Sequence, residues 1–385
     1  MRSNFMTLKY PVLQFKNIVI VFILLFISQQ AVGQNEYTIF KYYEPFRPDS
    51  SGNLYFALDN VNFFKNNEYK GDIATGYTLT GAWLRPKVVF YPDAKLRMEL
   101  GGNVLKYNGR DEYYHLLPWF NIHYQPTEKI SLILGNLNSD RNHNLPEFLA
   151  DPEMFLTSKP EAGLQAKYNS KHFSADLWID WQQFIVEGDP FKERFAFGTV
   201  ANWKIFESDY ASLSFPLAFY GLHLGGEIDS APGLAKSYIT VTPGLLFRKK
   251  ISNNMIKEYS LNANYSLSTY PIENFDPEES KGWGFYANGM IDTRLGGLSL
   301  AYCHGHKYYT PQGGILYQNV SNTGTTMIPE NELINLKYQY FHEIMPNTFF
   351  GFVFDYYYDT INKQTMNTEG LYLIVNFGVL TRRAK

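Results

Sequence analysis

The segment Cys303-His304-Gly305-His306 contains residue types that bind metal ions or act as catalytic bases. Zinc sites use three or four protein ligands. On a β-strand, successive side chains point to opposite faces, so His304 and His306 share one face and Cys303 points to the other. Because at most two ligands converge, the sequence predicts no metal at this segment, and we expect no cofactor elsewhere.

The same two histidines continue the apolar parity of Leu298, Leu300 and Tyr302 near the end of a predicted strand. A lipase-like enzyme of a membrane surface would place a catalytic histidine there, but the sequence assigns no serine or acidic partner to either ring. The stretch GLSLA at 297–301 approximates a nucleophile elbow, yet it lies inside a strand instead of at a strand-to-helix turn. The sequence therefore predicts that the protein is not an enzyme.

The elements that position these residues are predicted to be β-strands. From Glu258 to Ser268, polar and apolar residues alternate without exception, which is the two-residue period of a strand. The same alternation returns at 161–168, 173–181 and 334–340. One face of each strand is therefore apolar. It lies either against a protein core, as in a soluble sheet, or against lipid, as in a transmembrane barrel.

The lengths of the strands and of their connections favour the barrel. Most predicted strands exceed about ten residues, which is enough to cross a bilayer at a tilt and longer than the usual 5 or 6 of soluble sheets. Tight turns alternate with long polar links at 138–160, 185–191, 224–235, 271–280 and 309–330, as in outer-membrane barrels. The predicted strands are 53–63, 77–91, 95–107, 112–126, 129–138, 160–170, 172–184, 192–206, 208–223, 236–249, 256–270, 281–293, 296–308, 331–343, 347–359 and 366–380. We therefore predict an all-β fold, a transmembrane antiparallel up-and-down β-barrel of about 16 strands, with 14 to 18 as the range.

Residues 1–33 have the layout of a secretory signal peptide. Three basic residues precede the apolar run 18–27, and small residues precede a cleavage site before Gln34. The apolar run is too short for a membrane-anchoring helix, which needs about 20 residues. We expect a cleaved signal peptide at 1–33, a short periplasmic segment at 34–52 and the barrel at 53–385.

Composition agrees with a membrane protein and excludes several other classes. Aromatic residues make up 17% of the chain and charged residues 18%, below the roughly 25% of soluble domains. The formal net charge is −3, so a nucleic-acid partner, which would require a basic surface, is not expected. A single cysteine, Cys303, cannot form an intrachain disulfide.

Together, the signal peptide, the alternating strands, the turn asymmetry and the closing strand GLYLIVNF at 370–377 resemble Gram-negative outer-membrane β-barrel proteins of the porin-like kind. The resemblance covers nearly the whole mature chain and rests on diffuse patterning, not on a fingerprint. It implies an outer-membrane location, contact with outer-membrane lipid, insertion by barrel-assembly machinery through the C-terminal strand, and diffusion of small polar solutes. A homo-oligomer would also fit. Phe377 matches the terminal aromatic residue of such barrels, although this chain continues to Lys385.

Selectivity in such a channel would come from charges that face a water-filled lumen and from a loop that narrows it. The alternative for the lumen charges is that they pair with one another or only solvate the wall. Loop 139–160 is both charged and apolar, so it is expected either to fold inward as a constriction or to pack on the rim or a partner. The loop candidates are Asp140, Arg141, His143, Glu147, Asp151 and Glu153. The lumen candidates are Arg97, Glu99, His115, His123, Lys167, Asp176, Asp180, Arg194, Lys204, Arg248 and Lys337.

The function predicted from the sequence is thus a porin-like channel for small polar solutes. The first alternative is a structural, assembly or secretion-associated barrel whose extracellular face binds a partner through loops 271–280 and 309–330. The lesser alternative is an outer-membrane lipase-like enzyme with its base at His304 or His306.

Overall fold

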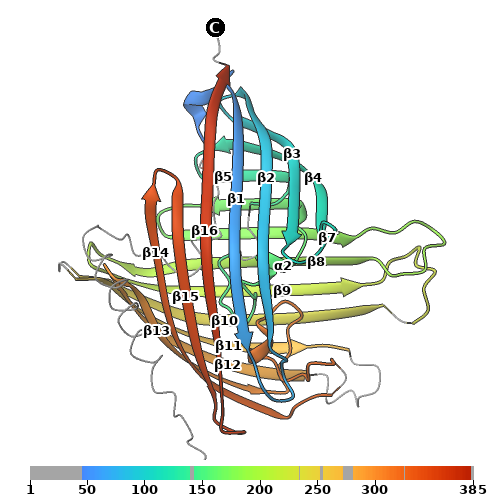
Figure 1. Ribbon diagram of the computed structural model, residues 1–385, viewed down its shortest axis with the longest axis vertical. Helices are drawn as coiled ribbons and strands as arrows, with labels where there is room; N and C mark the ends of the chain where they lie inside the picture. Colours follow the sequence, from blue (N-terminus) through green and yellow to red (C-terminus); the bar gives the residue numbers. More distant parts are fainter. Residues whose placement is uncertain are drawn as a thin grey trace, which may run out of the picture.

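The computed structural model is a single closed barrel of antiparallel strands (Figure 1). It describes residues 46–138, 143–233, 235–251, 255–271, 281–324 and 326–382. Within these ranges each strand pairs with its neighbours in sequence, and β1 pairs with β16 to close the barrel. The strands are β1 (Leu54–Glu68), β2 (Tyr77–Asp93), β3 (Leu96–Tyr107), β4 (His115–Thr127), β5 (Ile130–Asn136), β6 (Ala162–Asn169), β7 (Phe173–Gln183), β8 (Arg194–Glu207), β9 (Ala211–Leu224), β10 (Lys236–Lys250), β11 (Ile256–Thr269), β12 (Lys281–Thr293), β13 (Gly296–His306), β14 (Glu330–Met345), β15 (Thr348–Asp359) and β16 (Gln364–Arg382).

The predicted barrel of 16 strands is confirmed, with strand boundaries that differ by a few residues. The largest difference is at the first strand, which was expected to end at residue 63 and continues to Glu68. The extra residues are held by pairs on both sides, such as Lys65 with Gly370 of β16 and Lys65 with Leu79 of β2. The polar run 65–68 breaks the apolar pattern, so periodicity alone could not show that the strand continues.

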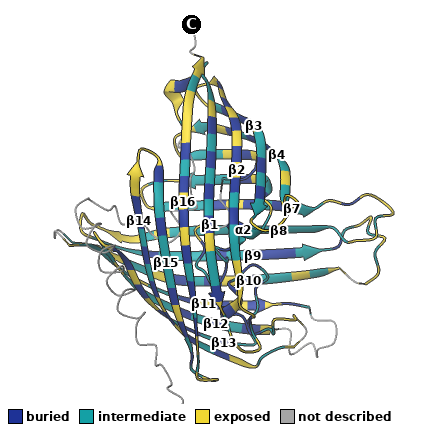
Figure 2. Ribbon diagram, in the orientation of Figure 1, coloured by how far each residue is buried: buried dark blue, intermediate teal, exposed yellow. Residues whose placement is uncertain are grey.

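The apolar parity of the strands faces outward. On β11, Leu261 and Leu267 are 61% and 55% exposed, whereas Ser266 and Ser268 are 0% and 2% exposed. The alternation of buried and exposed positions runs along most strands (Figure 2). A soluble sandwich would bury the apolar parity instead, so this arrangement is that of a barrel surrounded by hydrocarbon.

The two ends of the barrel differ. Most of the short turns and both ends of the described chain lie at one end, and the long connections lie at the other, together with the short turn between β15 and β16. In outer-membrane barrels the short turns face the periplasm and the long loops face outward, and we name the two ends on that basis. The signal peptide predicted at 1–33 lies outside the described residues, as does most of the segment 34–52, of which Pro48–Ser50 forms the short helix η1. Among the described residues, no helix is long and apolar enough to cross a membrane.

Two long connections fold into the barrel from its extracellular end. We call residues 143–161 the first inner loop, which contains the short helix α2 (Met154–Thr157), and residues 307–324 the second inner loop, which contains η3 (Ile315–Tyr317). Backbone hydrogen bonds join them, from Asp151 N to Gln312 O at 2.7 Å and from Gly314 N to Glu147 O at 2.9 Å. The two loops therefore form one packed unit inside the barrel.

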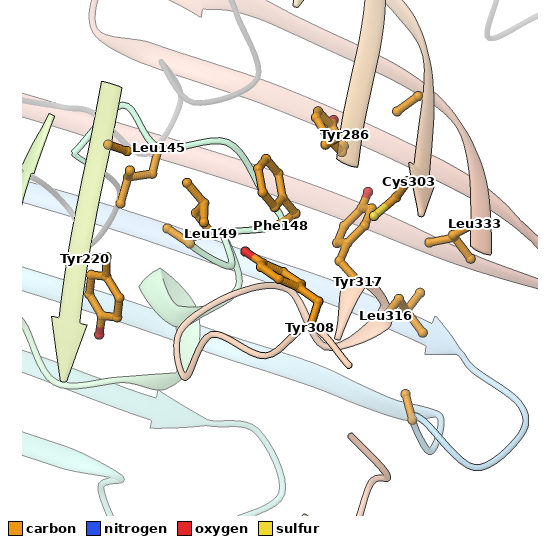
Figure 3. Packing of buried hydrophobic residues seen from close by; sticks show 14 of the residues in the cluster. Leu145, Phe148, Leu149, Tyr220, Tyr286, Cys303, Tyr308, Leu316, Tyr317 and Leu333 are labelled. Atoms are coloured by element: carbon orange, nitrogen blue, oxygen red, sulfur yellow. The ribbon is translucent and has the colours of Figure 1, made fainter. Parts of the chain in front are cut away.

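A hydrophobic cluster fills the extracellular half of the lumen where these loops meet (Figure 3). The ring of Phe148 in the first inner loop stacks on Tyr286 of β12 with centroids 4.9 Å apart, and Tyr286 meets Tyr317 of the second inner loop at 5.9 Å. The cluster also includes Tyr220 of β9 and Leu333 of β14, which belong to different parts of the wall. Because the cluster joins the loops to several strands, the interior of this half is a packed core.

Candidate functional site

The sequence placed eleven charged or histidine residues on the lumen face, and all of them lie on the inward parity of their strands. In the periplasmic half, Glu99 is the centre of a buried cluster. It accepts a hydrogen bond from Trp119 Nε1 at 2.8 Å, lies 3.3 Å from Lys87 Nζ and forms an ion pair with Arg97. Lys87 also contacts Asp59 at 2.9 Å. Each charge in this cluster thus has an opposite charge beside it.

Lys337 of β14 is the cation on which the first inner loop is anchored. The Lys337 side chain is 4% exposed, and its Nζ lies 2.7 Å from Glu147 Oε1 and 3.3 Å from Asp355 Oδ1. Glu147 belongs to the loop and Asp355 to β15, so the lysine joins the loop to the wall. A buried cation of this kind requires its anions, because an unpaired charge in a dry interior is very costly.

His143 fixes the start of the first inner loop. Its Nδ1 lies 3.0 Å from Asp176 Oδ2 and its Nε2 lies 3.1 Å from Glu161 Oε2, and its ring stacks on Trp178 at 3.6 Å between centroids. Burial disfavours the charged ring, but the carboxylates of Glu161 and Asp176 outweigh burial and raise the pKa of His143. The imidazolium is therefore the form that this position stabilises.

The end of the first inner loop carries a second pair of carboxylates. Burial, together with the nearby Glu153, raises the pKa of Asp151 to about 6. Burial acts on Glu153 in the same direction, but Lys65 of β1, 2.6 Å away, outweighs it and lowers the pKa of Glu153. Asn67 Nδ2 also donates to Glu153 at 2.9 Å. The loop is thus tied to β1 as well as to β14.

The remaining lumen and loop candidates have other partners, although Lys167 lies near the His143 site and His123 is paired with Arg97 across the β3–β4 ladder. Lys204 pairs with Glu207 at 2.6 Å, and Arg248 lies 3.9 Å from Glu258 near the periplasmic mouth. The predicted loop residues Asp140 and Arg141 lie outside the described residues. Arg194 donates a hydrogen bond to Gln182, and Asp180 accepts one from the backbone of Ala162. Lys167 donates to Asn138 O and lies 3.9 Å from Asp176. The two histidines lie against aromatic rings, His123 against Phe46 and His115 against Tyr114.

On the outer face, one cluster of titratable side chains lies at the extracellular ends of β13 and β14. His306 Nδ1 lies 2.6 Å from Glu330 Oε1, and His304 Nε2 lies 2.9 Å from Glu330 Oε2, so that one carboxylate bridges two imidazoles. All three side chains are accessible, at 39%, 36% and 46%. The ring of Trp283 on β12 lies beside both imidazoles, 5.1 Å from His304 and 6.1 Å from His306. We call these four residues the rim cluster.

Strand register explains why the rim cluster forms. His306 is paired with Glu330, and His304 with Glu332, across the β13–β14 ladder. Trp283 is opposite His306 on the other side of β13. Since His304, His306 and Glu330 all have outward parity, alternation places them on one face. Glu332 accepts from Tyr302 at 2.6 Å and from Thr360 at 2.5 Å, which extends the polar band along the rim.

The arrangement around His306 is that of an oriented general base. Its Nδ1 is held by a carboxylate, which leaves Nε2 directed away from the protein partner and fixes the tautomer. In the part of the chain that the structure describes, no serine or threonine hydroxyl contacts either imidazole. Water is therefore the nucleophile that this pair could activate. Within the same ranges, no three His, Cys, Asp or Glu side chains converge as a metal site.

A second polar row lies on the outer face of β1, β2 and β16. Asn62 Nδ2 donates to Asn60 Oδ1 at 2.6 Å within the apolar belt, and Asn66 Oδ1 accepts from Thr78 at 2.7 Å nearer the rim. Asn66 also donates to Glu369 at 3.4 Å. Polar groups that face lipid are costly, so this row is a second candidate for function. It contains no histidine.

Comparison with known proteins adds a family and a fold. The profile of the family described as Lipid A 3'-O-deacylase-type matches residues 46–383. The chain belongs to this family. Its match spans the whole barrel, including both the rim cluster and the polar row of β1.

Solved structures of similar shape include outer-membrane proteins. OprD of Pseudomonas aeruginosa aligns with a TM-score of 0.52 at 9% identity, over 92% of this chain and 99% of that chain. A loop-deletion mutant of OmpT of Vibrio cholerae aligns at 0.48 and 9% identity, over 84% and 98%. At such identity the OprD match shows the fold alone, which is the porin-like barrel that the sequence predicted. A search of curated proteins finds no match.

Membership in the Lipid A 3'-O-deacylase-type family overturns one prediction. The sequence had been interpreted as non-enzymatic because no acidic partner could be assigned to His304 or His306, and that interpretation is wrong for a deacylase family. The structure supplies the partner that was missing, since Glu330 contacts both rings. Glu330 was missed because the predicted strand began at 331, and because the register that sets it opposite His306 is not encoded in any local pattern.

Proposed function

We propose that the protein removes an acyl chain from lipid A at the outer rim of the barrel, with His306 as general base and Glu330 as its orienting carboxylate. The description of the family supports this substrate class and this reaction. The observation that carries the assignment of residues is the single carboxylate of Glu330 bridging two imidazoles on the lipid-facing side. A lipid substrate reaches this side by lateral movement in the membrane and never has to enter the lumen.

The proposed reaction is ester hydrolysis. His306 Nε2 takes a proton from water as the water oxygen adds to the ester carbonyl carbon. The tetrahedral intermediate then breaks its bond to the sugar oxygen, which receives that proton from His306 as it leaves. The products are a free fatty acid and an alcohol. Glu330 stabilises the imidazolium that forms between the two steps, as the carboxylate does in a catalytic triad.

His304 and Trp283 have supporting roles in this proposal. His304 occupies the second oxygen of Glu330 and limits the rotation of the carboxylate. Trp283 places an amphipathic ring beside both imidazoles at the level where strands leave the apolar belt, which suits a headgroup layer. The exposed faces of the rings remain available to a substrate headgroup.

The test is fatty-acid release from lipid A in mixed detergent micelles, measured by mass spectrometry on the purified, inserted protein. His306→Asn should lower the rate by about 100-fold or more, since a general base contributes about 10²–10⁴-fold. His304→Asn should have a smaller effect. The matched control is His223→Asn, because His223 is another outward histidine near the extracellular rim but bonds to the hydroxyl of Ser237, 2.8 Å away.

Two results would overturn this assignment. If the wild-type protein releases no fatty acid, the activity is wrong. If His306→Asn matches wild type while Glu369→Gln is inactive, the chemistry belongs to the polar row of β1, β2 and β16.

Diffusion of small polar solutes remains a second candidate, favoured by a polar pocket of about 240 Å³ lined by residues such as Lys204, Glu207 and Arg248 at the periplasmic mouth. The packed inner loops oppose it. Stepwise ion conductance of the inserted protein in planar bilayers would support it, and silent bilayers would not.

A further inference from the structure

The last part of β16 extends beyond β15 at the periplasmic end of the barrel. Val375 is the last residue of β16 that pairs with β15, and the next residue, Asn376, donates its N–H to Asn347 O in the β14–β15 turn at 2.9 Å. β16 continues to Arg382 along β1. Among the residues that the structure describes, residues 377–382 therefore have a strand on one side only (Figure 1). We call residues 377–382 the free edge.

The free edge is the border of a sheet that continues through β1 and β2. β1 pairs with β16 from Leu58 opposite Phe377 to Leu54 opposite Arg382, and the same residues of β1 pair with β2 on their other side. The ring of Phe56 on β1 lies beside that of Phe377, with centroids 6.4 Å apart. Because the edge is already ordered, the addition of another strand would cost only the ordering of the incoming chain.

Strand geometry fixes which backbone groups of the free edge are available. The N–H and C=O of one residue point to the same side of a strand, and those of the next residue point to the other side. The N–H of Asn376 points to the β15 side, since it bonds to the β14–β15 turn. Gly378 and Leu380 therefore direct their N–H groups to the unpaired side, whereas Val379 directs its N–H to β1.

The free edge lacks the features that oppose pairing at other strand ends. Proline or charge on an edge opposes the addition of another strand. Where β2, β4, β8 and β14 extend past a neighbouring strand at this end, their projecting residues include Pro92, Pro126, Glu207 and Glu343, respectively. Residues 377–380 of β16 are Phe-Gly-Val-Leu, with neither proline nor charge. The first part of the free edge is therefore open to an added strand.

The free edge ends in a basic segment. Arg382 is exposed, and Arg383 and Lys385 follow it in the sequence. No acidic residue occurs between Glu369 and Lys385. A chain added along the free edge would place one of its ends beside these cations, and charge complementarity would favour acidic residues at that end.

We propose that the free edge binds an extended, acidic segment of a periplasmic protein, which adds as one more strand beside β16. Backbone hydrogen bonds to Gly378 and Leu380 supply the affinity, and the basic end selects partners with acidic residues. An antiparallel strand would continue the line of β15, so its acidic residues would lie at its N-terminal end, beside Arg382. The interaction is independent of the activity proposed for the rim cluster, which lies at the other end of the barrel.

A synthetic peptide tests this site on the full-length protein inserted in nanodiscs. The peptide has about ten residues, begins with a pair of glutamates, continues with alternating threonine and valine, and carries a fluorophore for anisotropy measurements. Leu380→Pro removes an N–H from the unpaired side and leaves the pairing with β1 in place, so it should weaken binding about tenfold. The matched control, Leu380→Ala, keeps the N–H and should bind within about twofold of wild type. An equal loss in both variants would overturn the proposed backbone pairing.

A second peptide tests the charge of the partner. Replacement of the glutamates by lysines should weaken binding to the wild-type protein about fivefold. Arg382→Glu should reverse the preference between the two peptides, and this variant also tests the site if Leu380→Pro does not insert. Equal binding of the two peptides to the wild-type protein would overturn the acidic partner.

Hydrogen exchange identifies what occupies the free edge. The amides of Gly378 and Leu380 should exchange rapidly in the protein alone, and the acidic peptide should slow their exchange about tenfold or more. Slow exchange in the monomeric protein without peptide would mean that the chain covers its own edge. A dimer that Leu380→Pro dissociates would assign the edge to a second copy. Either result would overturn the proposed partner, as would a wild-type protein that does not bind the acidic peptide.

Discussion

The inner and outer faces of this barrel use charge in different ways. Inside, Lys337 is buried and lies between two carboxylates that join a loop to the wall. Outside, Glu330 is accessible and orients two imidazoles that a membrane lipid can reach. Buried, matched charges fix a shape, whereas accessible, oriented bases can act on a substrate. The charged clusters of the lumen hold the fold together, and the site proposed for deacylation is on the opposite face.

The largest effect on stability is expected for Lys337→Met. The change leaves Glu147 and Asp355 without their shared cation in a buried site, which should cost about 3–5 kcal/mol of unfolding free energy. Denaturant unfolding of the inserted protein measures this loss. Fatty-acid release per folded molecule should stay close to wild type. A large loss of activity in the folded fraction would mean that the lumen and the rim are not independent.

Glu330→Gln on the outer face should have the opposite result to Lys337→Met, a large loss of activity with little change in stability. The amide keeps the size of the carboxylate but cannot stabilise an imidazolium, so fatty-acid release should fall about 100-fold, or about 2.7 kcal/mol of transition-state stabilisation. The unfolding free energy should change by less than about 0.5 kcal/mol, because the side chain is exposed. A variant that is destabilised but equally active would reverse the roles assigned to the two faces.

The pH dependence of the first inner loop should be of intermediate size. The pKa of Asp151 is raised to about 6, and that of His143 is raised above its ordinary value of 6.5. In both cases the folded state binds the proton more tightly, so their contributions are present at low pH. As pH rises, the contribution of Asp151 is lost up to about pH 6, and that of His143 is lost as pH passes its raised pKa. Glu153, whose pKa is lowered, opposes this trend only below about pH 4.5.

Hydrogen exchange of the loop amides between pH 5 and pH 8 measures this effect. Protection at Leu149 and Ala150, whose amides donate to Pro146 O, should fall toward pH 8 by an amount equivalent to about 1–3 kcal/mol. Asp151→Asn should remove part of the slope. Protection that increases with pH after correction for intrinsic exchange would contradict the assigned shifts.

The smallest effect is expected at the periplasmic mouth. Arg248 is about half-exposed, and its Nε lies 3.9 Å from Glu258. Arg248→Gln should change the unfolding free energy by less than about 0.5 kcal/mol, as for most surface pairs. Comparison of the unfolding free energies of Arg248→Gln and Lys337→Met shows whether a lumen charge must be buried to contribute to stability.

The barrel could be predicted from the sequence because its signal is repeated in every strand. Alternation in Glu258 to Ser268 fixes the two faces, and the turn asymmetry fixes the ends. The first strand was less well defined, since Lys65 to Glu68 carry no apolar residue and only pairing with β2 and β16 extends the strand.

The candidate site could be predicted only in part. Parity places His304 and His306 on the outer face, but Glu330 reaches them through register, which is set by closure of the whole barrel. The inner loops show the same limit. The apolar residues of loop 139–160 indicated that the loop packs against another part of the protein. Lys337, which pairs with Glu147 of this loop, is almost two hundred residues away in sequence. Long-range pairings of this kind have no local signature.

Closure of the barrel by β1 and β16 also bears on biogenesis. Leu54 pairs with Arg382, so the seam joins nearly the first and the last described residues. Until the last strand has been exported, both free edges of the growing sheet expose unpaired backbone donors and acceptors, which promote aggregation. The unfolded chain therefore needs a chaperone that covers these edges. A truncation that removes β16 should give a protein that is degraded and does not form a smaller barrel.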